Sequence, residues 1–200
     1  MPGKDDQTLG FYAEEAGAYA GRNRQAEHHR IGLFTARLAP GARILELGCG
    51  GGQDSEEMLR RGFDVVPTDG SPELARQAER RLGRRVRVLL FEDLQEGAAY
   101  DGVWAHACLL HAPRPALPGI MDRIHAALRP GGVFYASFKA GETEGRDSLG
   151  RYFNYLSATE LRAVYGAETR WQSLEIEEEM GSGYDRQPTR WLHALAIKAP

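Results

Sequence analysis

The sequence predicts an α/β fold, in which a mostly parallel sheet of seven strands lies between two layers of helices. Short apolar runs alternate with amphipathic segments along the chain, and glycines or prolines close many of these runs. Two further strand-like runs come last, without a helix between them. Alternating strands and helices build a parallel sheet, whereas the last two runs can pair antiparallel through a turn. We therefore expect an antiparallel strand at the C-terminal end of the sheet.

Capping residues and apolar stripes place the helices. Asp54, with a glutamate three residues later, predicts the N-cap of the helix after the first strand. Ser71 precedes a proline and predicts a second capped start, and Ser157 with a glutamate three residues later predicts a capping box. The expected helices cover residues 9–20, 23–37, 54–61, 72–82, 120–128 and 157–165.

Apolar runs bounded by turn residues place the strands. The expected strands cover residues 43–47, 63–69, 86–91, 100–106, 133–139, 171–180 and 189–199. We expect residues 140–156 to form a polar loop that carries aromatic side chains. The chain length argues for one domain over residues 1–200, with a helical cap at residues 1–39 and the sheet-bearing core at residues 40–200.

Composition and charge argue against several classes of protein. Apolar residues make up 42% of the chain and charged residues 26%, with a net charge of −3, which is ordinary for a globular protein. We see no broad basic face, so we expect no nucleic-acid partner. Cys49 and Cys108 lie far apart, which predicts neither a disulfide framework nor a metal site. No apolar run has the length of a membrane span or a leader, so we expect a cytoplasmic monomer or homodimer without membrane contacts.

A glycine-rich turn after the first strand predicts a nucleotide-type site. Gly48, Gly50 and Gly52 let the backbone turn sharply and let a ligand approach it closely. The helix that follows offers free N–H groups at its start. Asp69 ends the second strand, and an ionised carboxylate there can accept hydrogen bonds from both hydroxyls of a ribose.

Both a nicotinamide dinucleotide and S-adenosylmethionine fit such a site, and the details of the turn separate them. The dinucleotide fingerprint G-x-G-x-x-G places its third glycine where this chain has Gln53. Here the spacing is G-x-G-x-G, with Gly52 as the third glycine. Glu46 stands just before the turn, where a carboxylate would repel a pyrophosphate but suits a cationic amino-acid end. Both departures favour S-adenosylmethionine.

The run from Ile44 to Gly52 resembles the first motif of class I S-adenosylmethionine-dependent methyltransferases. Segments similar to the family's later motifs follow in order at residues 65–71, 91–94, 100–105 and 128–132. The likeness covers residues 40–139, and the whole chain is similar to small bacterial members, some labelled tellurite-resistance-like. The resemblance implies a Rossmann-like three-layer sandwich, with a mostly parallel seven-stranded sheet and an antiparallel strand at its C-terminal end. It also implies S-adenosylmethionine as cofactor and a small-molecule methyl acceptor.

The resemblance implies that residues at positions matching the family's motifs contact the cofactor in this chain as well. The implied cofactor site comprises Tyr12, Tyr19, Arg24, Glu46, Gly48, Cys49, Gly50, Asp69, Gly70, Ser71, Phe91, Glu92, Asp93, Leu94, Ala105 and His106. Glu46 and the turn would hold the methionine end, and Asp69 would bind the ribose. Phe91 would stack on the adenine, and either Glu92 or Asp93 would accept from its amino group.

Methyl transfer is an in-line displacement, so alignment and desolvation can supply much of the catalysis. A general base is needed only where the acceptor atom carries a proton. His106 and His111 follow the fourth strand and are the candidates for this role. The alternative is that each is a structural or cofactor-contacting histidine.

Residues that bind the acceptor are expected after the fifth strand and between the last two strands, at the same edge of the sheet. The candidates are Arg146, Arg151, Tyr152, Tyr155, Tyr184 and Arg186. The alternative is an ordered lid without substrate contact. Two other functions stay open at this point: a nicotinamide-dependent oxidoreductase, and a module that holds the cofactor without transferring a methyl group.

Overall fold

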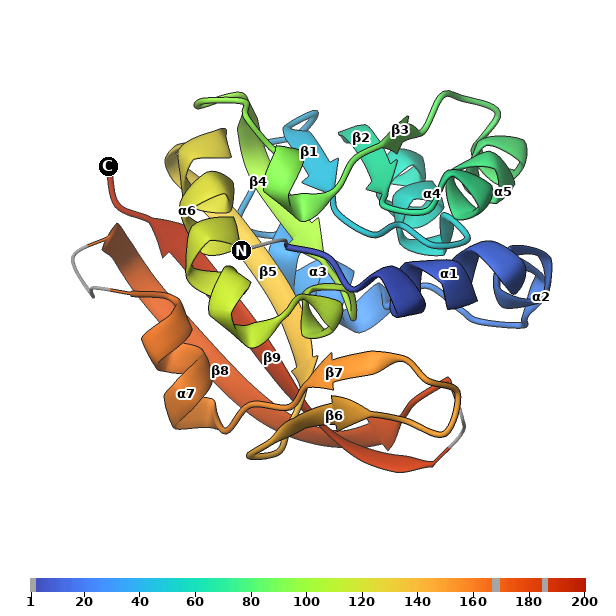
Figure 1. Cartoon of the computed structure of the whole chain (residues 1–200). Coiled ribbons are helices and arrows are strands. Elements are labelled where there is room, and N and C mark those ends of the chain that lie inside the picture. The colour runs from blue at the N-terminus through green and yellow to red at the C-terminus, as the bar shows by residue number, and fades with distance from the viewer. Residues whose placement is uncertain (1–2, 167–169, 185–186) are drawn as a thin grey trace.

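The computed structural model describes residues 3–166, 170–184 and 187–200 and contains a seven-stranded sheet (Figure 1). The strands of this sheet are β1 (Arg43–Glu46), β2 (Asp64–Asp69), β3 (Arg87–Val88), β4 (Tyr100–Ala105), β5 (Leu128–Lys139), β8 (Trp171–Ser182) and β9 (Pro188–Lys198). They lie in the order β3-β2-β1-β4-β5-β9-β8. The first five are parallel to one another, whereas β9 is antiparallel to both β5 and β8. The expected sheet, with an antiparallel strand at its C-terminal end, is confirmed.

The parallel strands bring chemically active side chains to one edge of the sheet. β1 lies between β2 and β4, and Glu46 is level with Pro67 and Trp104 on these neighbours. Glu46, Asp69 and Ala105 are the last residues of β1, β2 and β4. Sheets of this kind bind their ligands beyond the carboxyl ends of the strands.

Helices cover both faces of the sheet. They are α1 (Asp6–Glu14), α2 (Ala16–Gly21), α3 (His28–Thr35), α4 (Gln53–Arg60), α5 (Pro72–Leu82), α6 (Leu117–Ala127) and α7 (Ala158–Val164). α3 and α4 pack on one face, α6 and α7 on the other, and α1 and α2 lie against α5 (Figure 1). Within the described parts of the chain, no helix combines the length and the apolar character that crossing a membrane requires.

Alternate residues of each strand supply the two core layers. On β1, Ile44 packs in the layer under α3 and α4, whereas Leu45 packs in the layer under α6. Trp104 and Tyr135 stack in the first of these layers, with 4.0 Å between ring centroids. Burying an aromatic ring contributes about 2–3 kcal/mol, so this stack helps to seat α3 on the sheet.

Two predicted caps are confirmed. The Ser71 side chain accepts a hydrogen bond from the Leu74 amide at 3.3 Å and starts α5. Ser157 and Glu160 form the reciprocal bonds of a capping box at the start of α7.

The predicted Asp54 cap is wrong. α4 begins at Gln53, and Gly52 occupies the N-cap with a φ of 83°. The Asp54 carboxylate is bound to groups outside its own helix, and Glu57 pairs with arginines of the same helix end. Neither carboxylate is available to the first amides of α4.

The N-terminal helices are shorter than predicted. The expected helix over residues 9–20 is divided at Glu15, where φ is −91° and ψ is 7°. The expected helix over residues 23–37 begins only at His28. The Arg24 side chain and the Glu27 amide reach to α4 instead, and this holds residues 22–27 outside helical geometry.

Two other segments also differ from expectation. The strand expected over residues 86–91 shortens to β3, because Phe91 starts a 3₁₀ turn. Residues 140–156 contain a short hairpin made of β6 (Glu144–Arg146) and β7 (Tyr152–Asn154). This hairpin docks on the segment after β4, because the Asn154 amide donates to the Leu109 carbonyl at 3.0 Å.

Asp54 joins the N-terminal helices to the core. Its carboxylate is buried and accepts hydrogen bonds from Arg24 at 2.9 Å, from the Glu27 amide at 3.1 Å and from the Trp104 indole at 3.2 Å. Burial opposes ionisation, but the charge and the hydrogen bond of Arg24 outweigh it and hold the pKa of Asp54 below its usual range. One charged group therefore ties the segment before α3 to α4 and β4.

The Asp54→Asn variant should lower the free energy of unfolding by about 3 kcal/mol, because it leaves the buried Arg24 charge without a carboxylate. The loss relative to wild type should be full above pH 5 and shrink below about pH 4, where the unfolded chain protonates first. Urea unfolding followed by tryptophan fluorescence measures both effects. Glu56→Gln is the control, because Glu56 is an exposed acid of the same helix and should cost under about 0.5 kcal/mol. Equal losses in the two variants would contradict the role of Asp54.

Candidate functional site

The turn between β1 and α4 has a backbone that glycine adopts without strain. Gly48, Gly50 and Gly52 have φ values of 64°, 56° and 83°. A Cβ at Gly48 would lie 2.4 Å from the Cβ of Cys108, so this position has no room for a side chain. Both the backbone conformation and the contact with Cys108 therefore require glycine at Gly48.

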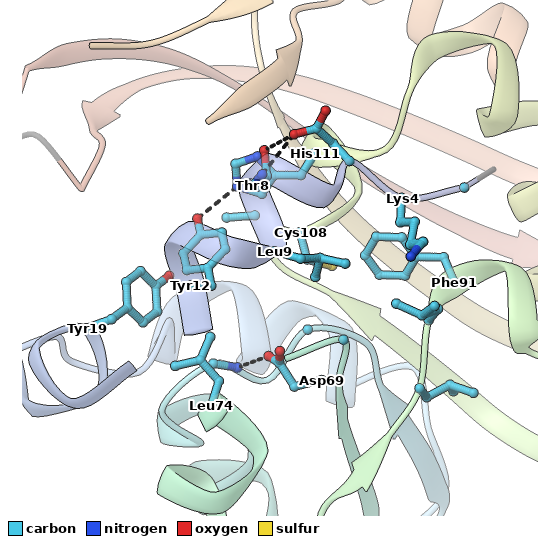
Figure 2. Close-up of a pocket in the computed structure, with 18 residues that line it drawn as sticks. Lys4, Thr8, Leu9, Tyr12, Tyr19, Asp69, Leu74, Phe91, Cys108 and His111 are labelled. Carbon is cyan, nitrogen blue, oxygen red and sulfur yellow. Dashed lines mark hydrogen bonds between the residues drawn. The ribbon is translucent and has the colours of Figure 1, made fainter. Parts of the chain in front are cut away.

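An inner cavity lies beside this turn (Figure 2). Asp69 lines it from the end of β2 and Phe91 from the 3₁₀ turn that follows β3, together with Gly48 and Gly50. Leu9 of α1 lies against its other side, as do the residues that precede this helix. The inner cavity is thus enclosed between the carboxyl edge of the sheet and the N-terminal segment.

Asp69 offers a carboxylate to the inner cavity. One of its oxygens accepts from the Gly50 amide and the other from the Ser71 amide, each at 2.8 Å. Each oxygen keeps a further lone pair for hydroxyl groups of a ligand. Burial raises the pKa of Asp69 to about 6, against the effect of the two amides.

An outer cavity adjoins the inner one. Tyr12, Tyr19 and His111 line both cavities, together with the turn at Gly48 and Gly50. A ligand that follows the turn would therefore have one end in each cavity.

Glu46 faces the outer cavity from the end of β1. The residue is 2% exposed, and the Ser55 hydroxyl donates a hydrogen bond to its carboxylate. Burial and the nearby charge of Asp54 raise the pKa of Glu46 above its usual range, and Arg24 does not offset this. A cationic group of a ligand would find here a carboxyl group that forms no ion pair with the residues the structure describes.

His106 is held by the same network as Asp54. Its Nδ1 lies 2.9 Å from Arg24 Nη2, and a guanidinium group can only donate, so Nδ1 accepts. The ring proton therefore lies on Nε2, which is 4.0 Å from the Glu27 carboxylate. His106 presents an N–H donor on the side away from Arg24.

His111 has the opposite arrangement. Its Nδ1 donates to the Tyr152 carbonyl at 2.7 Å, so Nε2 carries the lone pair and accepts from the Tyr12 hydroxyl at 2.9 Å (Figure 2). Arg151 donates to the Tyr12 oxygen at 3.2 Å. Burial lowers the pKa of His111 to about 4. The neutral His111 ring and the Tyr12 hydroxyl bonded to it thus both line the two cavities.

Most of the residues proposed for the site do line these cavities. They are Tyr12, Tyr19, Arg24, Glu46, Gly48, Cys49, Gly50, Asp69, Gly70, Phe91, His106, His111, Arg151 and Tyr184. They come from the N-terminal helices and the segment after α2, from the strand ends and the residues that follow them, from the loop between β6 and β7, and from the turn between β8 and β9.

Other predicted residues lie outside the cavity linings. For the cofactor, these are Ser71, Glu92, Asp93, Leu94 and Ala105, and for the acceptor they are Arg146, Tyr152 and Tyr155. Ser71 caps α5, Leu94 and Ala105 are buried in the core, and Glu92 accepts from the Gly3 amide. Arg146 pairs with Asp5 at 2.6 Å. Arg186 lies outside the described residues.

Sequence reasoning missed several residues of the outer cavity, namely Arg22, Lys139, Phe153, Trp191 and His193. No motif marks them, because their positions depend on how β7, β9 and the N-terminal helices meet over the edge. One sequence feature could have indicated Lys139: it is the last residue of the fifth parallel strand, and the ends of these strands meet at the edge where the site lies. Over the described ranges, no three His, Cys, Asp or Glu side chains gather as a metal site would require.

Comparison with known proteins agrees with this geometry. Residues 44–132 match a family model described as a methyltransferase domain. The ubiquinone biosynthesis O-methyltransferase of Xanthomonas campestris pv. campestris is 37% identical over 116 residues, which are 54% of this chain and 48% of that protein. The chain thus spans about half the length of the curated relatives of this kind that it matches.

Two further similarities extend over most of the chain. The 1,6-didemethyltoxoflavin-N1-methyltransferase of Burkholderia thailandensis has the same fold, with a TM-score of 0.76 at 23% identity over 98% of this chain and 88% of that chain. An uncharacterized methyltransferase of Synechocystis sp. is 31% identical over 163 residues, which are 79% of this chain and 71% of that protein. With this identity over most of both chains, the chain belongs to the methyltransferase family.

Proposed function

We propose that the protein is an S-adenosylmethionine-dependent methyltransferase that acts on a small-molecule acceptor. One observation carries the proposal: the inner cavity, with Asp69 and the glycine turn, shares part of its lining with the outer cavity, which Glu46 faces. A nucleoside with an amino-acid tail needs two joined spaces of this kind. The outer cavity continues past Glu46 and leaves room for an acceptor next to Tyr12 and His111.

The residues at the strand ends fit each part of this cofactor. The Asp69 oxygens can accept from the ribose hydroxyls, and the Phe91 ring offers a flat face to the adenine. Glu46 can pair with the ammonium group of the methionine end. The Burkholderia thailandensis enzyme was solved with S-adenosylhomocysteine bound, which supports this assignment for the shared fold.

The two alternatives have less support. A nicotinamide dinucleotide would place a pyrophosphate near the buried Glu46, and the family match is to methyltransferases. A module that binds the cofactor without turnover would have no use for the Tyr12 and His111 pair at the junction of the cavities. The cytoplasmic location, the monomer or homodimer state, the division at residue 40 and the tellurite-resistance-like grouping remain predictions from the sequence.

The chain's own residues explain how transfer would proceed. When bound, S-adenosylmethionine supplies a methyl group on a cationic sulfur that keeps the electron pair of the broken C–S bond. α1 and α2 exclude water from the junction of the cavities and help to align the acceptor. An acceptor that carries a proton can pass it to the Tyr12 oxygen, while the Tyr12 proton moves to Nε2 of His111.

The proposal is tested with S-adenosylhomocysteine and with methyl-labelled S-adenosylmethionine. The wild-type protein should bind the first, as measured by calorimetry, and should transfer label to an organic product in a small-molecule cell extract. Asp69→Ala should weaken binding at least about ten-fold, because hydrogen bonds to a charged carboxylate are lost. Wild-type affinity should also fall between pH 7 and pH 5, because Asp69 protonates with a pKa of about 6.

Asp64→Asn is the matched control, since Asp64 lies at the other end of β2 and pairs only loosely with Arg43. Its affinity should equal that of wild type. Lack of binding by the wild-type protein would refute the assigned cofactor, and binding without label transfer would favour the non-catalytic module.

Cofactor binding should release protons at pH 7. The pKa of Glu46 is raised in the free protein, and an ammonium group beside it would favour the ionised carboxylate. The binding heat of S-adenosylhomocysteine should therefore differ between phosphate and Tris, which take up protons with different enthalpies. The difference should correspond to up to about one proton and disappear in Glu46→Gln. Identical heats in the two buffers would show that Glu46 does not meet the ammonium group.

His111 should be a neutral histidine protonated on Nδ1 between pH 5 and pH 8, because its pKa lies near 4 and Nδ1 donates to a carbonyl. Nitrogen-15 spectra of the imidazole rings report the tautomer. Tyr12→Phe should shift the Nε2 resonance and slow label transfer about 100-fold for an acceptor that carries a proton. Tyr100→Phe, at the other end of β4, should leave both unchanged. An unshifted Nε2 resonance in Tyr12→Phe would argue against the pair.

A further inference from the structure

The side chains that line the outer cavity indicate which chemical class of acceptor fits there. This inference rests on the proposed function. We propose that the acceptor is a small organic anion whose carboxylate, phosphate or phosphonate group binds to Arg22. The acceptor would then lie along a wall of the outer cavity in which cationic side chains alternate with aromatic rings.

Arg22 has an unusual environment for a cation at the edge of a cavity. It follows α2, and its guanidinium group lies 3.6 Å from the centroid of the Tyr19 ring. Its Nη1 atom is buried and has no hydrogen-bond partner among the residues that the structure describes. Removing an N–H donor of a charged group from water costs free energy when no acceptor replaces the water. A ligand that supplies an anionic oxygen here would therefore be bound strongly.

Other arginines of the outer cavity are already neutralised by carboxylates. Arg24 pairs with Asp54 at 2.9 Å, and Arg151 pairs with Asp147 at 2.6 Å. In the described part of the chain, Arg22 instead has aromatic faces as its neighbours. This difference singles out Arg22 as the arginine whose counter-charge can come from a ligand.

The wall beyond Arg22 continues the same chemistry. Tyr184 lies between two cations, with Arg22 at 5.2 Å and Arg151 at 5.1 Å from its ring centroid. Phe153 follows, with Arg151 at 5.3 Å and the Lys139 ammonium at 4.3 Å from its centroid. Flat rings beside the uncompensated cation of Arg22 suit an anion that has a planar or apolar body.

The carboxylates of the outer cavity do not face this wall as free charges. Asp54 pairs with Arg24, Glu179 pairs with Arg30, and Glu27 lies near His106. Glu46 is the carboxyl group that the proposed function assigns to the ammonium group of the cofactor. These carboxylates therefore do not compensate the charge of Arg22, which favours an anionic acceptor over a cationic one.

Paired ligands that differ in charge test the inference. Wild-type protein saturated with S-adenosylhomocysteine is titrated by calorimetry with 4-hydroxybenzoate and 4-hydroxybenzamide, with phenylphosphonate and its dimethyl ester, and with inorganic phosphate. At least one organic anion should bind about ten-fold more tightly than its neutral partner, and its affinity should fall as salt is added. The carboxylate and phosphonate pairs show which anionic group the site prefers.

Variants then locate the charge. Arg22→Gln should lower the affinity of the preferred anion about ten-fold and leave the neutral partner unchanged, while Arg22→Lys should retain part of the preference. Arg80→Gln is the control, because Arg80 lies on the exposed face of α5. S-adenosylhomocysteine should bind to all these proteins equally.

The outcomes separate the two proposals. If the wild-type protein does not bind S-adenosylhomocysteine, the proposed function fails. If it does, but neutral partners bind as tightly as anions, or Arg22→Gln weakens both alike, the anionic acceptor is refuted. Binding of inorganic phosphate without any organic anion would also refute it, because the aromatic wall would then have no role.

Discussion

The buried carboxylate of Asp54 is the constraint on which the rest of the site depends. It lies in the first turn of α4, yet its partners come from the segment before α3 and from β4. Because Arg24 and the Glu27 amide must reach it, residues 22–27 stay irregular and α2 is held over the edge of the sheet. That position brings Tyr19 and Arg22 to the cavities, far in sequence from the strand ends that they face. A single ion pair with backbone and indole donors thus sets the shape of the binding edge.

The carboxylates at this edge divide into two kinds by their surroundings. Asp54 has a cation and several donors, and its pKa is lowered despite burial. Glu46 and Asp69 are just as buried. Their hydroxyl and amide donors do not compensate for the cost of burying a negative charge, so their pKa values are raised. An acid left short of donors in the free protein gains most when a ligand supplies them. The imbalance therefore supports the proposed ligand-binding roles of Glu46 and Asp69 and a structural role for Asp54, a distinction that burial alone would not make.

Local patterns in the sequence were enough to predict the sheet, the cap at Ser71 and the glycine turn, because each depends on residues close together in the chain. The errors have a common physical origin in long-range contacts. Asp54 has the sequence context of an N-cap, but Arg24 and Trp104 compete for its carboxylate and take it. The hairpin within residues 140–156 forms because Asn154 binds carbonyls after β4. Arg22 and Lys139 carry no motif, since only the meeting of distant elements places them in one cavity.

Hydrogen-bond direction resolves the two histidine candidates that sequence reasoning left equivalent. A guanidinium group only donates and a carbonyl only accepts, so Arg24 fixes Nδ1 of His106 as an acceptor, whereas the Tyr152 carbonyl fixes Nδ1 of His111 as a donor. The remaining nitrogens are therefore opposite in kind. Nε2 of His106 carries a proton, and Nε2 of His111 carries a lone pair that is already bonded to the Tyr12 hydroxyl. A group that must take up a proton needs a lone pair, so of the two histidines His111, acting through Tyr12, is the one that fits the proposed base role, whereas His106 is suited to donate to a bound oxygen.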